Sequence, residues 1–181
     1  MDKIRYEEFE RNPKDNAFRI LTTVGSTVIA CGWCDDKGLL YSEDNGKTWK
    51  ESNIIDGYFR HLITINDVVI TNSNYRRGLL YSENYGKTWK ESNIIDGHFS
   101  CLTTINNTVI VGSDSDKGLL YSEDNGKTWN QSNITDGDFN CLIVIGNRVI
   151  ASGNYNDKIC LLYSEDNGHA WIKYDDIITF C

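Results

Sequence analysis

Apolar and polar residues alternate over short stretches along most of the chain, and β-branched residues are common within these stretches. In one representative segment the alternation covers residues 101–105, and a second apolar run follows at 108–111 after an Asn-Asn pair. Further strands are expected at 119–121 and 127–130, separated by an Asn-Gly pair that suits a hairpin turn. A period of two flanked by Gly, Asn and Asp is typical of half-buried β-strands. No segment has a convincing 3.6-residue apolar period, so the sequence predicts an all-β protein.

This pattern is repeated along the chain. Its most constant part is a peptide that occurs four times, at Leu39–Trp49 (LLYSEDNGKTW), Leu79–Trp89 (LLYSENYGKTW), Leu119–Trp129 (LLYSEDNGKTW) and Leu161–Trp171 (LLYSEDNGHAW). The offsets are 40, 40 and 42 residues. A fixed period of this size indicates an array whose units bury their apolar faces by stacking on their neighbours. Four strands in about 40 residues are the sequence form of a propeller blade, so we predict a β-propeller of four-stranded antiparallel blades with four complete repeats.

The repeats also divide the chain into three parts. Phe residues recur once per unit, at Phe18, Phe59, Phe99, Phe139 and Phe180. We therefore expect an N-terminal segment at 1–17 that includes a possible edge strand, four blades at 18–177, and the start of a fifth repeat or a tail at 178–181.

The repeated peptide contains a segment of the pattern S-x-D-x-G-x-T-W, which resembles the Asp-box, or BNR, motif. The positions that carry the resemblance are Ser42, Asp44, Gly46 and Trp49, then Ser82, Asn84, Gly86 and Trp89, then Ser122, Asp124, Gly126 and Trp129, and finally Ser164, Asp166, Gly168 and Trp171. The second copy has Asn84 in place of Asp, and the fourth has Ala170 in place of Thr. The family includes sialidases, sortilin-like receptors and photosystem assembly factors, all with Asp-box propellers. The resemblance implies that each box is a structural turn between the third and fourth strands, at the periphery of a blade.

The residue types of the box suit that structural role. An Asp at the head of a turn accepts hydrogen bonds from backbone N–H groups further along it, and Gly adopts positive φ angles without strain. Trp supplies a large apolar surface for packing between sheets. A Ca²⁺ loop is the alternative, but one carboxylate pair is few for a cation that takes six to eight oxygen ligands. We expect no bound metal and no cofactor.

The net charge of −8 at pH 7 disfavours nucleic acid and anionic membrane surfaces as partners, since no stripe of Lys and Arg is present to neutralise phosphates. No apolar stretch reaches about eighteen residues, and residues 1–5 are polar rather than signal-like. No membrane association is expected.

The six cysteines are Cys31, Cys34, Cys101, Cys141, Cys160 and Cys181. Cys31 and Cys34 form a C-x-x-C sequence, but a redox motif needs a βαβ context and a zinc site needs a second pair. Cys101 and Cys141 occupy one repeat position, as small buried residues do. We expect reduced structural thiols, which favour a cytoplasmic location.

A sialidase-like glycoside hydrolase is the enzymatic hypothesis that the resemblance raises. Sialidases resemble one another in three arginines that bind the substrate carboxylate, a Tyr–Glu nucleophile pair and an acidic Asp. The segment Phe18–Leu21 (FRIL) approaches the early arginine motif of that family but lacks its Pro, and the repeat has a copy at Phe59–Leu62 (FRHL). His61, His98 and His169 are dispersed, with no partner pattern for nucleophilic catalysis or metal binding. The sequence favours a protein that is not an enzyme.

A non-catalytic binding or scaffold module is the favoured hypothesis, because variable loops on a rigid frame carry recognition. The loops that differ between units are 33–37, 74–77, 114–117 and 154–158. Within them Trp33, Tyr75, Arg76 and Tyr155 are candidate contacts for a protein or carbohydrate partner, although the aromatic residues have packing on neighbouring loops as an alternative role. A purely structural repeat array is the third hypothesis.

The two ends of the array raise the question of ring closure. Residues 5–8 resemble the last strand of a blade, and Phe180 resembles the start of one. An open arc of four blades would expose strand edges, which proteins avoid. We expect either a ring closed within one chain, with residues 3–9 adding an edge strand, or a homodimer that completes a larger ring head to tail, and we favour the second.

Overall fold

The computed structural model describes residues 18–32, 38–73, 78–114 and 117–174, and these residues form four antiparallel sheets of four strands each. Blade 1 consists of β1 (Phe18–Val24), β2 (Thr27–Gly32), β3 (Leu40–Ser42) and β4 (Lys50–Glu51). Blade 2 consists of β5 (Phe59–Ile65), β6 (Val68–Ser73), β7 (Leu79–Ser82) and β8 (Lys90–Glu91). Blade 3 consists of β9 (Phe99–Ile105), β10 (Thr108–Ser113), β11 (Leu119–Ser122) and β12 (Asn130–Gln131). Blade 4 consists of β13 (Asp138–Ile145), β14 (Arg148–Tyr155), β15 (Lys158–Ser164) and β16 (Ile172–Lys173).

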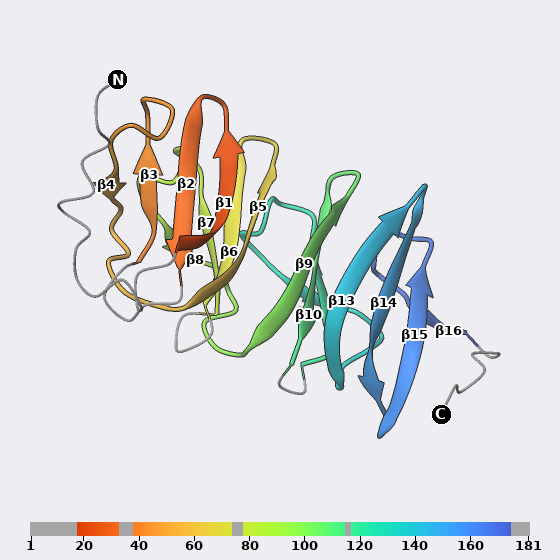
Figure 1. Cartoon of the computed structure of the whole chain (residues 1–181). Helices are drawn as coiled ribbons and strands as arrows, with labels where there is room; N and C mark the ends of the chain where they lie inside the picture. Colours follow the sequence, from red (N-terminus) through yellow and green to blue (C-terminus); the bar gives the residue numbers. More distant parts are fainter. Residues whose placement is uncertain (1–17, 33–37, 74–77, 115–116, 175–181) are drawn as a thin grey trace.

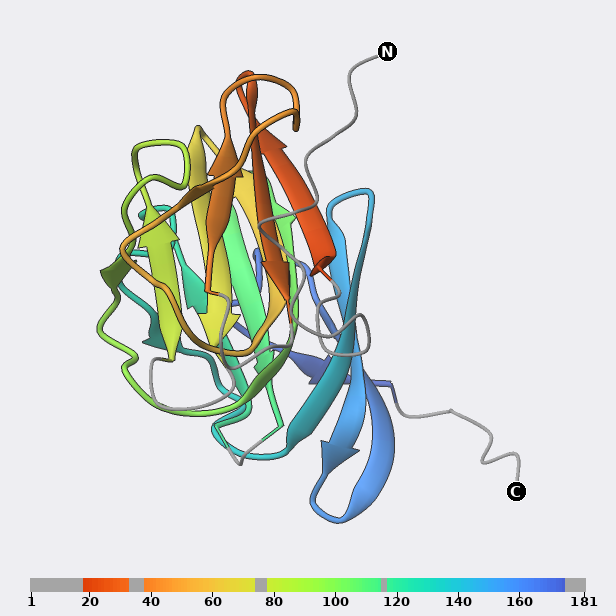
Figure 2. The same ribbon diagram turned by 60° about the vertical axis from the view of Figure 1, so that its left-hand side comes forward.

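The sheets follow one another as the blades of a propeller arc, which confirms the predicted fold class (Figure 1). Within each blade the strands pair in chain order. The first strands contact one another from blade to blade, so that β5 contacts both β1 and β9, and β13 contacts β9. The four sheets stack in chain order, and the described ends of the arc belong to blades 1 and 4 (Figures 1 and 2). None of the described residues forms a helix, so this part of the chain contains no helix that could cross a membrane.

The strands lie close to where the alternation predicts them, except for the last strand of each blade. In blade 3 the run 127–130 was expected to be a strand, but β12 begins only at Asn130. The preceding residues form the box turn, in which Asn125 has a φ of 61° and Gly126 a φ of 81°. The Asn-Gly pair therefore has the positive φ angles expected of it. The chain becomes extended again only after the Trp that closes the box.

The core lies between the blades. We call the side of a blade that packs on the next blade its trailing face, and the side that packs on the preceding blade its leading face. The trailing faces of blades 1 to 3 contribute Val24, Ile29 and Leu39, then Ile65, Ile70 and Leu79, then Ile105, Ile110 and Leu119. The leading faces of blades 2 to 4 contribute Phe59, Val69, Leu80 and Trp89, then Phe99, Val109, Leu120 and Trp129, then Phe139, Val149, Leu162 and Trp171.

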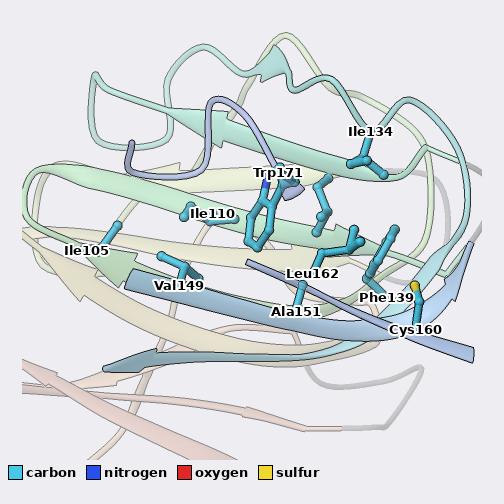
Figure 3. Packing of buried hydrophobic residues seen from close by; sticks show 10 residues of the cluster. Ile105, Ile110, Ile134, Phe139, Val149, Ala151, Cys160, Leu162 and Trp171 are labelled. Atoms are coloured by element: carbon cyan, nitrogen blue, oxygen red, sulfur yellow. The ribbon is translucent and has the colours of Figure 1, made fainter. Parts of the chain in front are cut away.

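The same repeat positions therefore meet at all three boundaries, and every one of these side chains is buried. Figure 3 shows the third boundary, where Trp171 of blade 4 lies among residues that include Ile110 of blade 3. Burial of each large side chain contributes about 1.5–3 kcal/mol, so contacts between blades dominate the stability of the array.

The two ends of the blades differ in what they present. One end, which we call the box end, carries the Asp-boxes and the hairpins that join the first and second strands of each blade. The opposite end, which we call the loop end, carries the connections between second and third strands and the links that lead into the next blade. In blade 4 the predicted loop 154–158 is instead a tight hairpin, because Tyr155 pairs with Lys158 across a turn at Asn156 and Asp157.

Candidate functional site

Each Asp-box is a hydrogen-bonded turn between the third and fourth strands. In blade 3 the Ser122 hydroxyl donates to Asp124 Oδ1 at 2.9 Å and accepts from the N–H of Gly126 at 2.9 Å. Asp124 Oδ1 also accepts from the N–H of Thr128 at 2.8 Å, and Asp124 Oδ2 accepts from the Thr128 hydroxyl at 2.6 Å. The indole N–H of Trp129 donates to the carbonyl of Gly126 at 3.0 Å. The polar groups of the box are thus used within the turn itself.

The two boxes that depart from the motif keep most of this network. Asn84 Oδ1 accepts from the Ser82 hydroxyl and from the N–H of Thr88, and Asn84 Nδ2 donates to the Thr88 hydroxyl at 2.8 Å. In this box an amide replaces the carboxylate. Its hydrogen bond with the Thr88 hydroxyl therefore runs in the opposite direction, from the amide to the hydroxyl. In blade 4 Asp166 Oδ1 accepts from the N–H of Ala170, and the hydroxyl bond is lost because Ala has no hydroxyl.

Hydrogen bonds hold the box carboxylates in their charged form. The Thr48 hydroxyl and N–H, with the Ser42 hydroxyl, lower the pKa of Asp44 from its ordinary 3.8 to about 2. Burial raises the pKa of Asp124, but the Thr128 and Ser122 hydrogen bonds outweigh it and the net direction is down. Charge-assisted hydrogen bonds favour the ionised form in this way.

Pairs of charged side chains join neighbouring boxes. Glu43 of blade 1 pairs with Lys87 of blade 2 at 2.6 Å, and Glu83 of blade 2 pairs with Lys127 of blade 3 at 2.6 Å. At the next step the Lys is replaced by His169, which lies 3.2 Å from Glu123. The hydrogen bonds from Lys50 and Lys87 lower the pKa of Glu43 to about 2.

An Asn side chain connects each blade to the next, a feature that the sequence analysis missed. Asn93, which follows β8 of blade 2, donates from Nδ2 to the carbonyl of Trp129 at 3.0 Å and accepts from the N–H of Trp129 at 2.8 Å. Asn53 makes the same pair of bonds to Trp89, and Asn133 makes it to Trp171. The signal was the repeated Ser-Asn-Ile that follows the fourth strand of blades 1, 2 and 3.

Charged side chains of different blades meet at the loop end. Arg60, near the start of β5, lies with Nη1 3.3 Å from Oδ2 of Asp114, which follows β10. The backbone N–H of Asp114 donates to the carbonyl of His98 at 3.0 Å, which places the carboxylate between blades 2 and 3. The other carboxylate oxygen, Oδ1, is buried without a hydrogen-bond partner among the described residues.

A second ion pair lies on the same rim. Lys117 Nζ is 2.7 Å from Oδ1 of Asp96 in the link between blades 2 and 3. The loop that carries Lys117 is supported by Gln131, whose Nε2 donates to the carbonyls of Lys117 at 3.0 Å and Ile134 at 2.8 Å. Gln131 occupies a position where the first two units have Glu51 and Glu91. The loop end therefore presents both signs of charge on a supported backbone.

His61 lies below this rim, on the innermost strand of blade 2. Burial lowers the pKa of His61; the Asn72 side chain opposes this, and the positive charge of Arg60 adds a smaller lowering effect. Asn72 is fully buried, and its Nδ2 donates to the carbonyl of Phe99 in the next blade. The Nδ1 of His61 and the Oδ1 of Asn72 are buried without a hydrogen-bond partner in the described part of the chain. The Asn72 side chain thus links blade 2 to blade 3.

The structure places one of the four predicted contact residues. Trp33, Tyr75 and Arg76 lie outside the described residues. Tyr155 is at the end of β14, where it is half-buried and packs against the core between blades 3 and 4. The alternative role of packing therefore describes Tyr155 better than ligand contact.

The thiols of the described cysteines are free. Burial raises the pKa of Cys31 and of Cys101 to about 12, so neither is a thiolate at neutral pH. Cys141 is exposed, which corrects the expectation of a buried residue, because no following blade covers its strand among the described residues. Cys34 and Cys181 lie outside the described residues. No group of three or more His, Cys, Asp and Glu residues that could hold a metal ion occurs in the described ranges.

Sequence comparison supports the identity of the boxes. Residues 40–51 and 120–131 match the family model described as BNR/Asp-box repeat. These are the first and third copies, the two that fit the motif fully. No curated protein has significant sequence similarity to the chain.

The fold is similar to that of several solved structures. The computationally designed Ika8 protein matches with a TM-score of 0.60 at 11% identity, covering 83% of this chain and 47% of that chain. YCF48 bound to D1 peptide matches with a TM-score of 0.58 at 18% identity, covering 90% and 55%. The Hadza microbial sialidase Hz136 matches with a TM-score of 0.51 at 15% identity, covering 89% and 47%.

This chain spans about half the length of each of these three proteins. Together with the four sheets, these comparisons show a β-propeller-type fold in which two of the four box turns match the BNR/Asp-box repeat. Neighbours of this fold include both enzymes and proteins without a stated catalytic activity.

Proposed function

We propose that this protein is a non-catalytic recognition module that binds a segment of another protein at its loop end. The single observation that carries the proposal is that the two ends of the blades use their polar side chains differently. At the box end the repeated residues use their polar groups to hold turns and to join blades. At the loop end the connections between second and third strands differ between units, and the variable residues Arg60 and Asp114 form an ion pair. Beside it lie Asp96 and Lys117, whose charges recur in other units, so both signs of charge are present on one rim.

This rim suits recognition of a polypeptide. The ion pairs are partly exposed, so an incoming segment can exchange them for its own charged groups. Electrostatic complementarity of this kind provides specificity and orientation. The match to YCF48, which was solved with D1 peptide, adds support because that propeller holds a peptide.

A sialidase-like reaction has less support. Arg60 and Arg148 are engaged by carboxylates of this chain, Asp114 and Glu165 respectively. They also lie at opposite ends of the blades, since Arg148 begins β14 beside the fourth box. An arginine cluster that clamps one substrate carboxylate needs its members to converge. We therefore propose a role without catalysis.

The experiment is a binding screen of the purified protein on a peptide array, with a glycan array in parallel. The informative variant is Arg60→Ser, because blade 3 carries Ser100 at the same repeat position. We expect peptide binding that Arg60→Ser weakens by about tenfold or more, equivalent to about 1.4 kcal/mol. The matched control is Lys90→Ala, which removes a cation of the box end that pairs with Glu83 and should leave peptide binding unchanged.

The other outcomes contradict the proposal in distinguishable ways. Binding only to glycans would show a carbohydrate partner. No binding on either array would favour a purely structural repeat array. Turnover of a fluorogenic sialoside that depends on an arginine would show a sialidase-like enzyme.

A further inference from the structure

The trailing face of blade 4 is exposed where the other three trailing faces are buried. Ile145 has 65% of its surface exposed, whereas the residues at the same repeat position have 2%, 7% and 4% exposed in blades 1, 2 and 3. Ile143, two residues earlier on β13, is 52% exposed. Ile150 and Leu161 are half-buried, although their counterparts in the other blades are fully buried. An apolar sheet face thus ends the arc.

The leading face of blade 1 is uncovered in the matching way. Leu21 is 62% exposed, and Phe18 and Trp49 are half-buried. The corresponding Phe and Trp residues of blades 2, 3 and 4 are buried, with the three Trp side chains at most 4% exposed. Phe18 and Trp49 stack on each other on this face, with their ring centroids 6.4 Å apart.

A glycine contact shows how closely the two faces correspond. At Gly86, Gly126 and Gly168 a Cβ would approach an Ile of the preceding blade to 2.8, 2.7 and 2.6 Å. These Ile residues are Ile29, Ile70 and Ile110, and the fourth member of the series is Ile150. At Gly46 an added Cβ would meet only Trp49 of its own box, at 3.8 Å. Gly46 and Ile150 therefore occupy the two repeat positions that contact each other at all three boundaries between blades.

We propose that the trailing face of blade 4 packs against the leading face of blade 1 of a second copy of this chain, so that two copies form one head-to-tail ring. The occupant is a second copy because each face is a repeat of a face that already has this partner. The interface buries Ile143, Ile145 and Ile150 against Leu21, Gly46 and Trp49.

A ring of more than four blades agrees with the length of one solved neighbour. The match to Ika8 covers 83% of this chain and 47% of that chain, so the Ika8 chain is about twice as long as the part that aligns with these blades. Two copies joined head to tail make two identical interfaces, and a heterologous interface that closes gives a ring rather than a filament.

The test is the mass in solution, measured by light scattering over a range of concentrations. We expect twice the chain mass of 20.6 kDa for the unmodified protein. Ile145→Arg, on the trailing face, and Leu21→Glu, on the leading face, should each give monomers. Both positions are highly exposed in the single chain, so circular dichroism should show unchanged folding. Ile95→Glu is the matched control, because Ile95 is 59% exposed on an internal link and should leave the dimer intact.

Mixing the two variants distinguishes head-to-tail packing from other dimers. At one interface of the mixed pair the introduced arginine of Ile145→Arg faces the introduced glutamate of Leu21→Glu, so opposite charges meet, and the other interface is unmodified. We expect dimers to reappear in the mixture. A monomer at all concentrations, a dimer that survives Leu21→Glu, or growth into open filaments would each overturn the proposal.

Discussion

At the scale of single residues, the box carboxylates act as acceptors that hold a turn. Asp124 receives three hydrogen bonds from its own turn, and Asp44 receives the same three. The other two boxes differ only in the hydroxyl bond, because Asn84 donates to the Thr88 hydroxyl and Ala170 has no hydroxyl. The natural Asn84 shows that the shape and the hydrogen-bonding groups matter more than the charge.

A pair of substitutions at Asp124 tests this interpretation. Asp124→Ala should lower the free energy of unfolding by roughly 1–3 kcal/mol, because it leaves the N–H of Thr128 and the hydroxyl of Ser122 without their acceptor. Asp124→Asn should cost much less at neutral pH, since Asn84 makes the equivalent bonds. Urea denaturation measures both values. Equal losses for Ala and Asn would mean that the charge, rather than the hydrogen bonding, stabilises the box.

The depressed pKa values predict how stability depends on pH. The pKa of Asp44, Glu43 and Glu83 in the folded protein is about 2, below the ordinary 3.8 for Asp and 4.5 for Glu. Their contribution is therefore fully present at neutral pH and is lost as the pH falls from about 5 towards 2. The melting temperature should decrease over this window. The double variant Glu43→Gln and Glu83→Gln should flatten the decrease, and an unchanged slope would contradict this assignment.

At the scale of elements, the boundary between two blades is the unit that holds the protein together. The sequence predicted the first three strands of blade 3 well, because alternation and turn residues are local signals. In blade 4 it predicted a loop at 154–158, where β14 and β15 instead meet in a tight hairpin. It placed the fourth strand too early, because Thr128 and Trp129 look like strand residues but have hydrogen bonds to the box and to Asn93. Arg60 and Asp114 are 54 positions apart, and nothing local to either residue indicates that they meet.

Asn93 provides a direct test of the links between blades. Asn93→Ala removes the donor and the acceptor that pair with the backbone of Trp129, which leaves both backbone groups unsatisfied in a partly buried site. We expect a loss of about 2–4 kcal/mol in the free energy of unfolding. Gln131→Glu, which restores the acidic residue of the first two units, is a nearby control expected to cost less. A loss for Asn93→Ala within the error of zero would show that these bonds are not needed.

Two glycine substitutions separate backbone strain from packing between blades. Gly46 and Gly126 have nearly the same φ, 83° and 81°, so Ala should cost about 1–2 kcal/mol at either site through backbone strain. Gly126→Ala should cost about 1–3 kcal/mol more, because its Cβ would lie 2.7 Å from Cδ1 of the buried Ile70. Thermal unfolding of dilute, monomeric protein measures the difference. Equal costs would show that Ile70 moves aside freely.

At the scale of the whole molecule, the array separates support from recognition. The box end and the boundaries between blades use the repeated residues, and the loop end carries Arg60 and Asp114, which distinguish one unit from another. The sequence identified which loops vary between units. It did not predict the two ion pairs of the rim, which form only when links and loops of adjacent blades are folded together.

Recognition at the loop end is tested most sharply by the backbone amide NMR spectrum of the protein titrated with a peptide from the array screen. We expect the signals of residues 58–61, 96–98, 113–114 and 117–118 to shift on binding, while those of the box residues 122–128 stay in place. Shifts confined to the boxes, with the loop end unchanged, would contradict this expectation.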